Sequence, residues 1–270
     1  MTEPCSRVQF KGMSNAFDPD DDPAQVAAAK AAKGKLAEDD LLREDPNNLV
    51  ADPAVPRDAA TLILYRIEAD GPRILMGCRS EGHDFMPNKY VFPGGRVDDE
   101  DTGIPIASDL PEDCARRIAL GAKRPARDFA LTAVREMFEE TGLVVGERGA
   151  AASDASPSWR SYFEQGAVPS LKHFQFLGRA ITPPMRHKRF DARFFIANAD
   201  EALIDDRAPI DSRELADLRW FTLAEVAGLD LPNVTRFVIS EIEARLAGGE
   251  QADPFYLYWN EGGHTRERIS

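Results

Sequence analysis

Three glutamates within residues 135–143 carry the strongest chemical signal in the sequence. Glu136, Glu139 and Glu140 share one face if this stretch is helical, because positions i, i+3 and i+4 of a helix are neighbours. Like charges that close repel one another, and a bound divalent cation removes the repulsion. Carboxylate oxygens suit Mg²⁺ or Mn²⁺, ions that keep several waters and bridge to phosphates. The stretch therefore indicates metal-assisted chemistry at phosphorus.

Arg135 stands directly before these glutamates. A guanidinium can hold a carboxylate through a bidentate contact without competing for the metal, so we expect Arg135 to orient one. The alternative is that the stretch is only the solvated face of an amphipathic helix. A Phe-Pro-Gly-Gly turn at residues 92–95 lies upstream and favours the chemical interpretation.

The turn and the glutamate stretch together resemble the Nudix hydrolase signature, G-x(5)-E-x(7)-R-E-U-x-E-E-x-G-U, where U is a bulky aliphatic residue. The sequence REMFEETGL at 135–143 supplies the R, the three E and the G in order, with Met137 and Leu143 at U positions. The resemblance implies the Nudix fold, an α/β (α+β) fold with a mixed β-sheet sandwiched between α-helices. It also implies a loop-helix-loop that binds the metal ions.

Carried over to this chain, the resemblance implies a set of site residues. The expected metal-site residues are Glu136, Glu139, Glu140 and Gly95. The same glutamates are expected to be catalytic, together with Arg135 in its orienting role. Gly94 and Gly95 of the turn are expected to contact the substrate, and Gly142 to end the helix.

The chain departs from the signature between the turn and the glutamates. Asp101 lies six residues after Gly95, where the signature has its first glutamate, although Asp98, Asp99 or Glu100 would take that position in a shifted loop. The stretch from there to Arg135 is longer than the signature by about 26 residues, an insertion at about 100–127. Its Pro, Gly and Ser content predicts a surface loop without a role in the reaction; the alternative is a lid or anion contact over the site. Its basic residues are Arg116, Arg117, Lys123, Arg124 and Arg127.

Expanded signatures of this kind resemble those of the peroxisomal coenzyme A diphosphatase branch and its bacterial relatives. Residues 75–95 follow the spacing of the coenzyme A signature, L-L-T-x-R-[SA]-x(3)-R-x(3)-G-x(3)-F-P-G-G. The residues in place before the turn are Leu75, Arg79 and Ser80, and those that depart are Gly77, Asp84 and Asn88. Asp84 puts an anion where the signature has a second arginine, which leaves coenzyme A as one candidate among several.

Residues outside the signature supply candidates for substrate binding and proton transfer. Arg79 is a predicted phosphate contact through its spacing, and Arg189 through the basic cluster RHKRFDARFF. Phe85 is a candidate to stack on a base, with core packing as the alternative. Glu214, six residues before Trp220, is the candidate general base, and the alternative is a solvent-facing loop acid.

Composition limits the partners. The net charge of −13, from 46 acidic and 33 basic side chains, argues against a protein that wraps nucleic acid. The three cysteines lie far apart without a CxxC pair, which predicts neither disulfides nor a cysteine zinc site and favours a reducing cytoplasm. No apolar run approaches the roughly 20 residues that span a bilayer. Because Nudix proteins often dimerise, a homodimer is a further expectation.

Periodicity and composition divide the chain into three parts. Residues 1–58 are acidic and rich in Ala and Pro, which predicts a mobile arm. Residues 59–248 mix strands and helices, as expected of a Nudix domain, beginning with a hairpin and including a helix that Gly142 ends. Residues 249–270 are polar and turn-rich, which predicts a tail.

The resemblance implies Mg²⁺-dependent hydrolysis of the pyrophosphate bond in a nucleoside diphosphate linked to another group. Water would attack one phosphorus, and the candidate substrates are coenzyme A, acyl-coenzyme A, NADH and ADP-ribose-like molecules. The alternative, from a different class of function, is a Nudix-fold module that binds a nucleotide or a partner without cleaving it.

Overall fold

The structure is a computed structural model that describes residues 54–82, 86–150, 155–184, 186, 188–248, 253–260 and 263–270. Most of the predicted arm lies outside these residues, and so do Asp84 and Phe85. The first strand begins at Arg57, just before the predicted start of the domain. Within the described segments, no helix combines the length and the apolar character needed to cross a bilayer.

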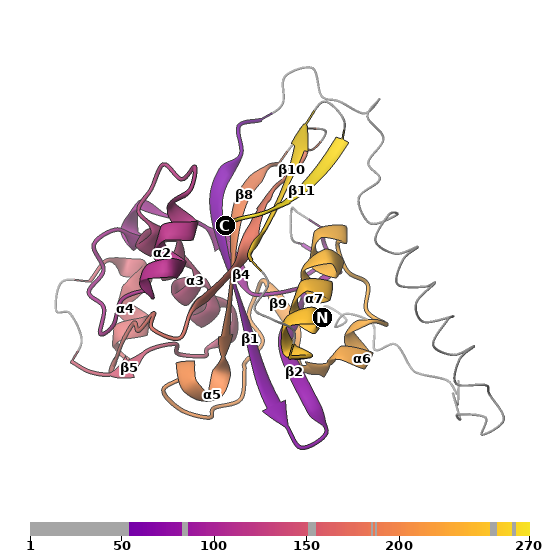
Figure 1. Cartoon of the computed structure of the whole chain (residues 1–270). Helices are drawn as coiled ribbons and strands as arrows, with labels where there is room; N and C mark the ends of the chain where they lie inside the picture. Colours follow the sequence, from indigo (N-terminus) through magenta and orange to yellow (C-terminus); the bar gives the residue numbers. More distant parts are fainter. Residues whose placement is uncertain are drawn as a thin grey trace.

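A mixed sheet forms the centre of the described structure (Figure 1). Its strands are β1 (Arg57–Glu68), β2 (Gly71–Arg79), β3 (Tyr90–Val91), β4 (Gly94–Arg96), β7 (Gln175–Ile181), β8 (Phe190–Asn198), β9 (Leu215–Thr222), β10 (Phe255–Asn260) and β11 (Gly263–Arg268). The order is β11-β10-β7-β8-β1-β2-β3, with β4 paired to β1 and β9 to β2. Two pairs are parallel, β1 with β8 and β7 with β10, and the others are antiparallel. A separate small pair joins β5 (Glu147–Arg148) to β6 (Ala167–Val168).

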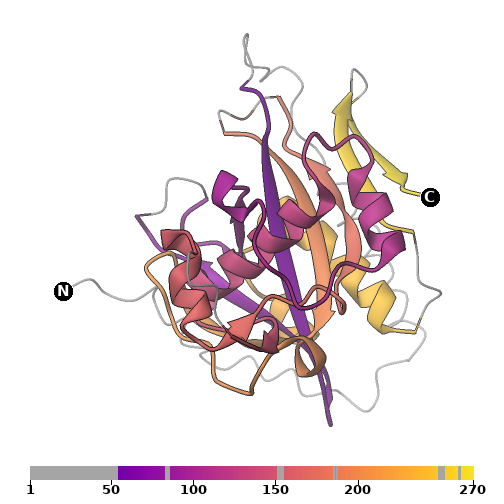
Figure 2. The ribbon, with the colours of Figure 1, turned by 90° about the vertical axis from the view of Figure 1, so that its left-hand side faces the viewer.

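Helices cover both faces of the sheet (Figures 1 and 2). They are η2 (Asp99–Asp101), α2 (Glu112–Ala119), α3 (Ala126–Thr141), α4 (Pro157–Phe163), α5 (Ala199–Ala202), α6 (Leu223–Val226) and α7 (Asn233–Leu246). Along β1, Leu62 and Leu64 belong to the core beneath α2, α3 and α4, while Ile63 belongs to the core beneath α6 and α7. Successive side chains of a strand point to opposite faces, so the apolar run of β1 fills both cores.

The predicted hairpin and the predicted helix that Gly142 ends are confirmed. Strands β1 and β2 pair antiparallel around a turn at Gly71, whose φ of 126° suits a residue without a Cβ. Helix α3 buries Phe129, Ala133 and Met137 completely and ends at Gly142, which has a left-handed φ of 72°. Before the signature helix, the short strands β3 and β4 are separated by Phe92 and Pro93, and Pro93 has no N–H to donate.

The insertion differs from the predicted loop because it contains helix α2 and the start of α3. Cys114 and Ile118 lie four residues apart on one face of α2, and both are buried in the same core as α3. The short apolar face of α2 thus packs on the domain, which composition alone did not reveal.

The C-terminal segment was predicted as a polar tail, and this prediction was wrong for residues 255–268. Strands β10 and β11 extend the main sheet, β10 pairing with β7. Phe255 and Leu257 alternate with tyrosines and are buried beside α7. This two-residue period is the signal of a strand with one buried face, and the surrounding polar residues obscured it.

Candidate active site

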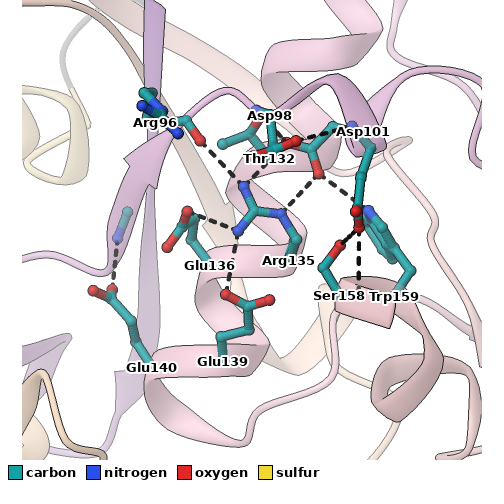
Figure 3. A network of polar contacts seen from close by, with 12 residues as sticks. Arg96, Asp98, Asp101, Thr132, Arg135, Glu136, Glu139, Glu140, Ser158 and Trp159 are labelled. Carbon is teal, nitrogen blue, oxygen red and sulfur yellow. Dashed lines mark hydrogen bonds and ion pairs between the residues drawn. The ribbon is translucent and has the colours of Figure 1, made fainter. Parts of the chain in front are cut away.

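The signature turn and the glutamate helix meet in space (Figure 3). Glu140 accepts a hydrogen bond from the backbone N–H of Gly94 at 2.8 Å, which joins α3 to β4. Glu136 lies against the next glycine, because a Cβ on Gly95 would overlap the carboxylate of Glu136. The structure therefore brings both predicted glycines to two of the three predicted glutamates.

The two glycines are required for different reasons. A Cβ on Gly94 would lie 2.5 Å from the carbonyl oxygen of Ala60 and 2.7 Å from Cα of Thr61, and this backbone belongs to the paired strand β1. A Cβ on Gly95 would instead meet the end of the Glu136 side chain, which can move. Gly94 thus serves strand pairing, whereas Gly95 leaves space for a carboxylate.

Arg135 connects the glutamates to the rest of the site (Figure 3). Its Nη1 donates to Glu136 at 2.8 Å and to Glu139 at 3.2 Å, and its Nη2 donates to the carbonyl of Arg96 at 3.1 Å. The bidentate contact expected of Arg135 is made with Asp101 instead, through Nε and Nη2 at 2.8 and 3.1 Å. The Arg135 guanidinium therefore holds the carboxylates of Glu136 and Glu139. It also holds the turn, through the carbonyl of Arg96, and the acid Asp101.

Asp101 is the acid that takes the position of the first signature glutamate. It is fully buried, and besides Arg135 it accepts hydrogen bonds from Thr132 Oγ1 at 2.7 Å, Trp159 Nε1 at 3.1 Å and the N–H of Asp98 at 3.1 Å. Its neighbour Asp98 caps η2. Of the acids that the sequence left open, Asp101 is the one that pairs with Arg135.

Thr132 and Trp159 are the residues of this network that sequence reasoning missed. Thr132 lies one helical turn before Glu136 on α3, so its position four residues before a signature glutamate was the available signal. Trp159 comes from α4, and neither spacing nor composition connects it to the signature. Only the folded chain brings its indole N–H to Asp101.

Burial raises the pKa of all three signature glutamates. It raises the pKa of Glu136 to about 7, against the opposing charge of Arg135. The pKa of Glu140 is raised well above its usual range by burial and then by the charge of Glu136. Burial also raises the pKa of Glu139, again opposed by Arg135. The site disfavours three ionised carboxylates, and a divalent cation between them would offset this.

The donor set fits Mg²⁺ or Mn²⁺ by its chemistry. Among the described residues, no three His, Cys, Asp or Glu side chains are arranged as a ready-made metal site. Mg²⁺ in phosphoryl-transfer sites is typically held by one or two carboxylates plus waters and substrate phosphates, so a closed protein cage is not required. The hard oxygens of Glu136, Glu139 and Glu140, on one helix face that is buried at Glu140 and exposed at Glu139, suit that mode of binding beside the glycine turn.

Glu214 and Arg79 are brought to the same end of the sheet. The N–H of Ser80 donates to the carbonyl of Glu214 at 2.9 Å, and the loop before β9 is tied to the end of α3 by the N–H of Ile210 donating to Thr141 at 2.8 Å. Burial lowers the pKa of Arg79, and the charge of Glu214 opposes this. Glu214 also contributes to the raised pKa of each signature glutamate, after burial as the main cause.

Arg189 is not among the residues that line the cavity beside the signature turn. Its guanidinium donates to the carbonyls of Thr182 and Ala54, each at 2.9 Å, and so supports the start of β8. From the same basic cluster, Arg186 lines the cavity. The sequence indicated the basic cluster, but the fold was needed to show that Arg186, and not Arg189, lines the cavity.

The insertion is fastened to the domain by its arginines. Two ion pairs reach aspartates outside it, Arg117 with Asp253 and Arg124 with Asp99, whereas Arg116–Asp113 and Arg127–Asp109 are pairs within the insertion. Arg179 of β7 donates to the carbonyls of Leu120 and Gly121 at the end of α2. These contacts favour the structural interpretation of the insertion over a lid or anion contact.

A cavity of about 460 Å³ lies on the α7 side of the sheet, beside the signature turn. Gly95 and Arg79 line it next to the glutamate helix, and further walls come from β1, β7, β8, the first turn of α7 and the hairpin β10–β11. Its basic side chains are Arg79, Lys89 and Arg186, with His264. No carboxylate stands among the described lining residues, although acidic residues outnumber basic ones 46 to 33 in the chain. The cavity therefore suits an anionic ligand with an apolar part.

Comparison with known proteins relates the chain to Nudix hydrolases. No family model matches it. It is 28% identical over 177 residues to putative nudix hydrolase 7 of Caenorhabditis elegans, covering 61% of this chain and 50% of that protein. It is 27% identical over 202 residues to acyl-coenzyme A diphosphatase NUDT19 of Gallus gallus, covering 53% of this chain and 52% of that protein. The chain thus spans about half the length of these curated relatives.

A solved structure gives the fold. The Nudix hydrolase of Alicyclobacillus acidocaldarius superposes with a TM-score of 0.52 at 22% identity, covering 72% of this chain and 92% of the other. The chain has the Nudix fold, and the resemblance to the Nudix superfamily predicted from the signature is confirmed. The match to an acyl-coenzyme A diphosphatase agrees with the predicted resemblance to the branch with the expanded signature.

Proposed function

We propose that the chain is a Nudix pyrophosphohydrolase that uses Mg²⁺ or Mn²⁺ to cleave a nucleoside diphosphate linked to another group. The observation that carries this proposal is the meeting of Glu136 and Glu140 with Gly95 and Gly94, beside Glu139 and next to a cavity with basic lining residues. The similarity to named Nudix hydrolases supports the same reaction class.

In this proposal Glu136, Glu139 and Glu140 hold the metal. A bound divalent ion supplies charge for the phosphate oxygens and lowers the pKa of a bound water. Arg135 keeps Glu136 and Glu139 in place while it is itself held by Asp101. The protein's part is placement, because phosphoryl transfer depends mainly on position and charge.

Glu214 is the proposed general base. Its loop is joined by backbone hydrogen bonds to the end of α3 and to Ser80, the residue after Arg79. Its carboxylate is close enough to all three signature glutamates to contribute to their raised pKa, after burial as the main cause. A base at this position would take the proton of the attacking water.

The proposed substrate is a coenzyme A or acyl-coenzyme A, with NADH and ADP-ribose-like molecules as the other candidates. The cavity supports an elongated ligand with a phosphate end near Arg79. Incubation of the purified protein with Mg²⁺ and each candidate, followed by chromatography of the products, tests this. Release of 3′,5′-ADP from coenzyme A supports the proposal. Binding without turnover of any candidate would favour the silent binding module instead. A cytoplasmic location and a homodimer stay predictions.

A further inference from the structure

One row of cross-strand partners forms a side of the cavity. Leu257 of β10 pairs with Ala180 of β7, Ala180 with Ala192 of β8, and Ala192 with Ala59 of β1. All four residues line the cavity. The next partner in the row, Arg96, belongs to β4 of the signature turn. Adjacent strands are about 4.8 Å apart, so the row runs about 14 Å from Ala59 to Leu257.

The side chains in this row grade from small to large. The three alanines project only a methyl group into the cavity and so leave space along most of the row. Leu257 is the first large side chain of the row. Leu257 is 3% exposed and packs in the same core cluster as Phe194 of the cavity wall. A ligand lying along the alanines from the signature turn would therefore meet Leu257 at the far end.

The walls facing the row have the same apolar character. Leu231 and Val234, at the start of α7, line the cavity opposite the sheet. Phe194 lines it from β8, two residues after Ala192 of the row. His264 is one of the polar lining residues, and its ring packs edge-on against Trp259 at 5.1 Å; the others are Thr61, Arg79, Lys89, Thr182, Arg186, Asn233 and Thr235. The alanine row is a smooth aliphatic surface that suits an extended chain, and Phe92, Phe190 and Phe194 add apolar lining to the cavity.

We propose that the hairpin β10–β11 is a specificity element, in which Leu257 limits the length of an elongated, mainly aliphatic arm attached to the diphosphate. This inference rests on the proposed function for the position of the diphosphate. Arg79 and the turn glycine Gly95 mark the anionic end of the ligand, and the alanine row receives its arm.

Two substitutions of Leu257 are expected to act in opposite directions. Leu257→Trp shortens the space at the end of the row, so it should lower the ratio of kcat/KM for octanoyl-coenzyme A over acetyl-coenzyme A about tenfold, the effect of excluding about two methylene groups. Leu257→Ala lengthens the space, so it should raise the ratio for palmitoyl- over octanoyl-coenzyme A.

Tyr258→Trp is the matched control. Tyr258 is the next residue of β10, is not among the lining residues and donates its hydroxyl to Glu267 at 2.8 Å. The same bulky side chain there should leave both ratios at the wild-type value. Thermal melting of each variant identifies any that fails to fold, and the two Leu257 variants disturb packing in different ways.

Binding separates this inference from the proposed function. Calorimetry with octanoyl- and acetyl-coenzyme A in EDTA needs no turnover, and Leu257→Trp should weaken binding of the octanoyl form selectively. If no candidate substrate is cleaved, the proposed function fails while this binding result still decides the inference. Unchanged selectivity in folded Leu257→Trp and Leu257→Ala, or an equal change in Tyr258→Trp, would overturn it.

Discussion

Asp101 and Arg135 form a bidentate ion pair across the insertion, with Nε to Oδ1 at 2.8 Å and Nη2 to Oδ2 at 3.1 Å. The two residues are separated by the whole insertion in sequence, yet Asp101 is fully buried beneath α3. The shorter acid at the signature position still reaches the arginine. The insertion has therefore lengthened the signature without separating its parts.

Asp101→Asn should destabilise the fold and lower activity. Removing one partner of a buried pair typically costs about 3–5 kcal/mol, because the remaining charge stays buried. Chemical denaturation measures the change in the free energy of unfolding. The matched control is Asp99→Asn, whose side chain is 88% exposed and pairs with Arg124, so a change of less than about 1 kcal/mol is expected. Equal stability of the two variants would contradict a structural role for Asp101.

Gly94→Ala and Gly95→Ala should separate stability from activity. The new Cβ of Gly94→Ala meets the backbone of β1, so we expect a loss of about 1–3 kcal/mol in the free energy of unfolding. The new Cβ of Gly95→Ala meets only the Glu136 carboxylate, which can move. We therefore expect a nearly unchanged melting temperature, and a marked fall in kcat because Glu136 is displaced. A fully active Gly95→Ala enzyme would show that the position of Glu136 is unimportant.

Glu214→Gln should lower kcat by about 10²- to 10⁴-fold if Glu214 is the general base. Metal affinity should stay near the wild-type value, because Glu214 is not a proposed ligand. Glu164→Gln, at the exposed end of α4, is a control that should not change the rate. A wild-type rate in Glu214→Gln would contradict its role as the general base and favour one of the signature glutamates instead.

Cys114 should resist alkylation in the native protein. Burial raises the pKa of its thiol to about 12, so at pH 8 the reactive thiolate is scarce, and its side chain is packed between α2 and the core. Iodoacetamide labelling followed by peptide mass spectrometry, with and without denaturant, measures this protection. Native labelling as fast as in denaturant would show that α2 does not pack on the domain.

The predictable parts of this molecule are those with short-range signals. The spacing of Glu136, Glu139 and Glu140 and the glycine after the helix indicated α3 and its acidic face, because helix neighbours are three or four residues apart. Contacts between distant segments were not predictable in this way. Trp159 reaches Asp101 from another helix, and nothing in its local sequence records that contact.

Two other features depend on contacts between distant segments in the same way. Arg189 and Arg186 belong to one basic cluster, and the fold alone decides that Arg186 lines the cavity. Leu257 lies in a short strand whose two-residue period was concealed by polar neighbours, so the segment was predicted as a tail. Its pairing with β7, far away in sequence, is what makes it part of the cavity.

The decisive measurement is the Mg²⁺-dependent turnover of Glu140→Gln and Glu139→Gln beside the wild-type protein, with Mg²⁺ affinity followed by calorimetry. A carboxamide is a poor Mg²⁺ ligand, although its oxygen can still accept the N–H of Gly94, so the fold should persist. We predict that both variants melt at nearly the wild-type temperature, bind Mg²⁺ more weakly and lose kcat by orders of magnitude. Wild-type turnover and Mg²⁺ affinity in both folded variants would contradict the assignment of this helix as the metal site.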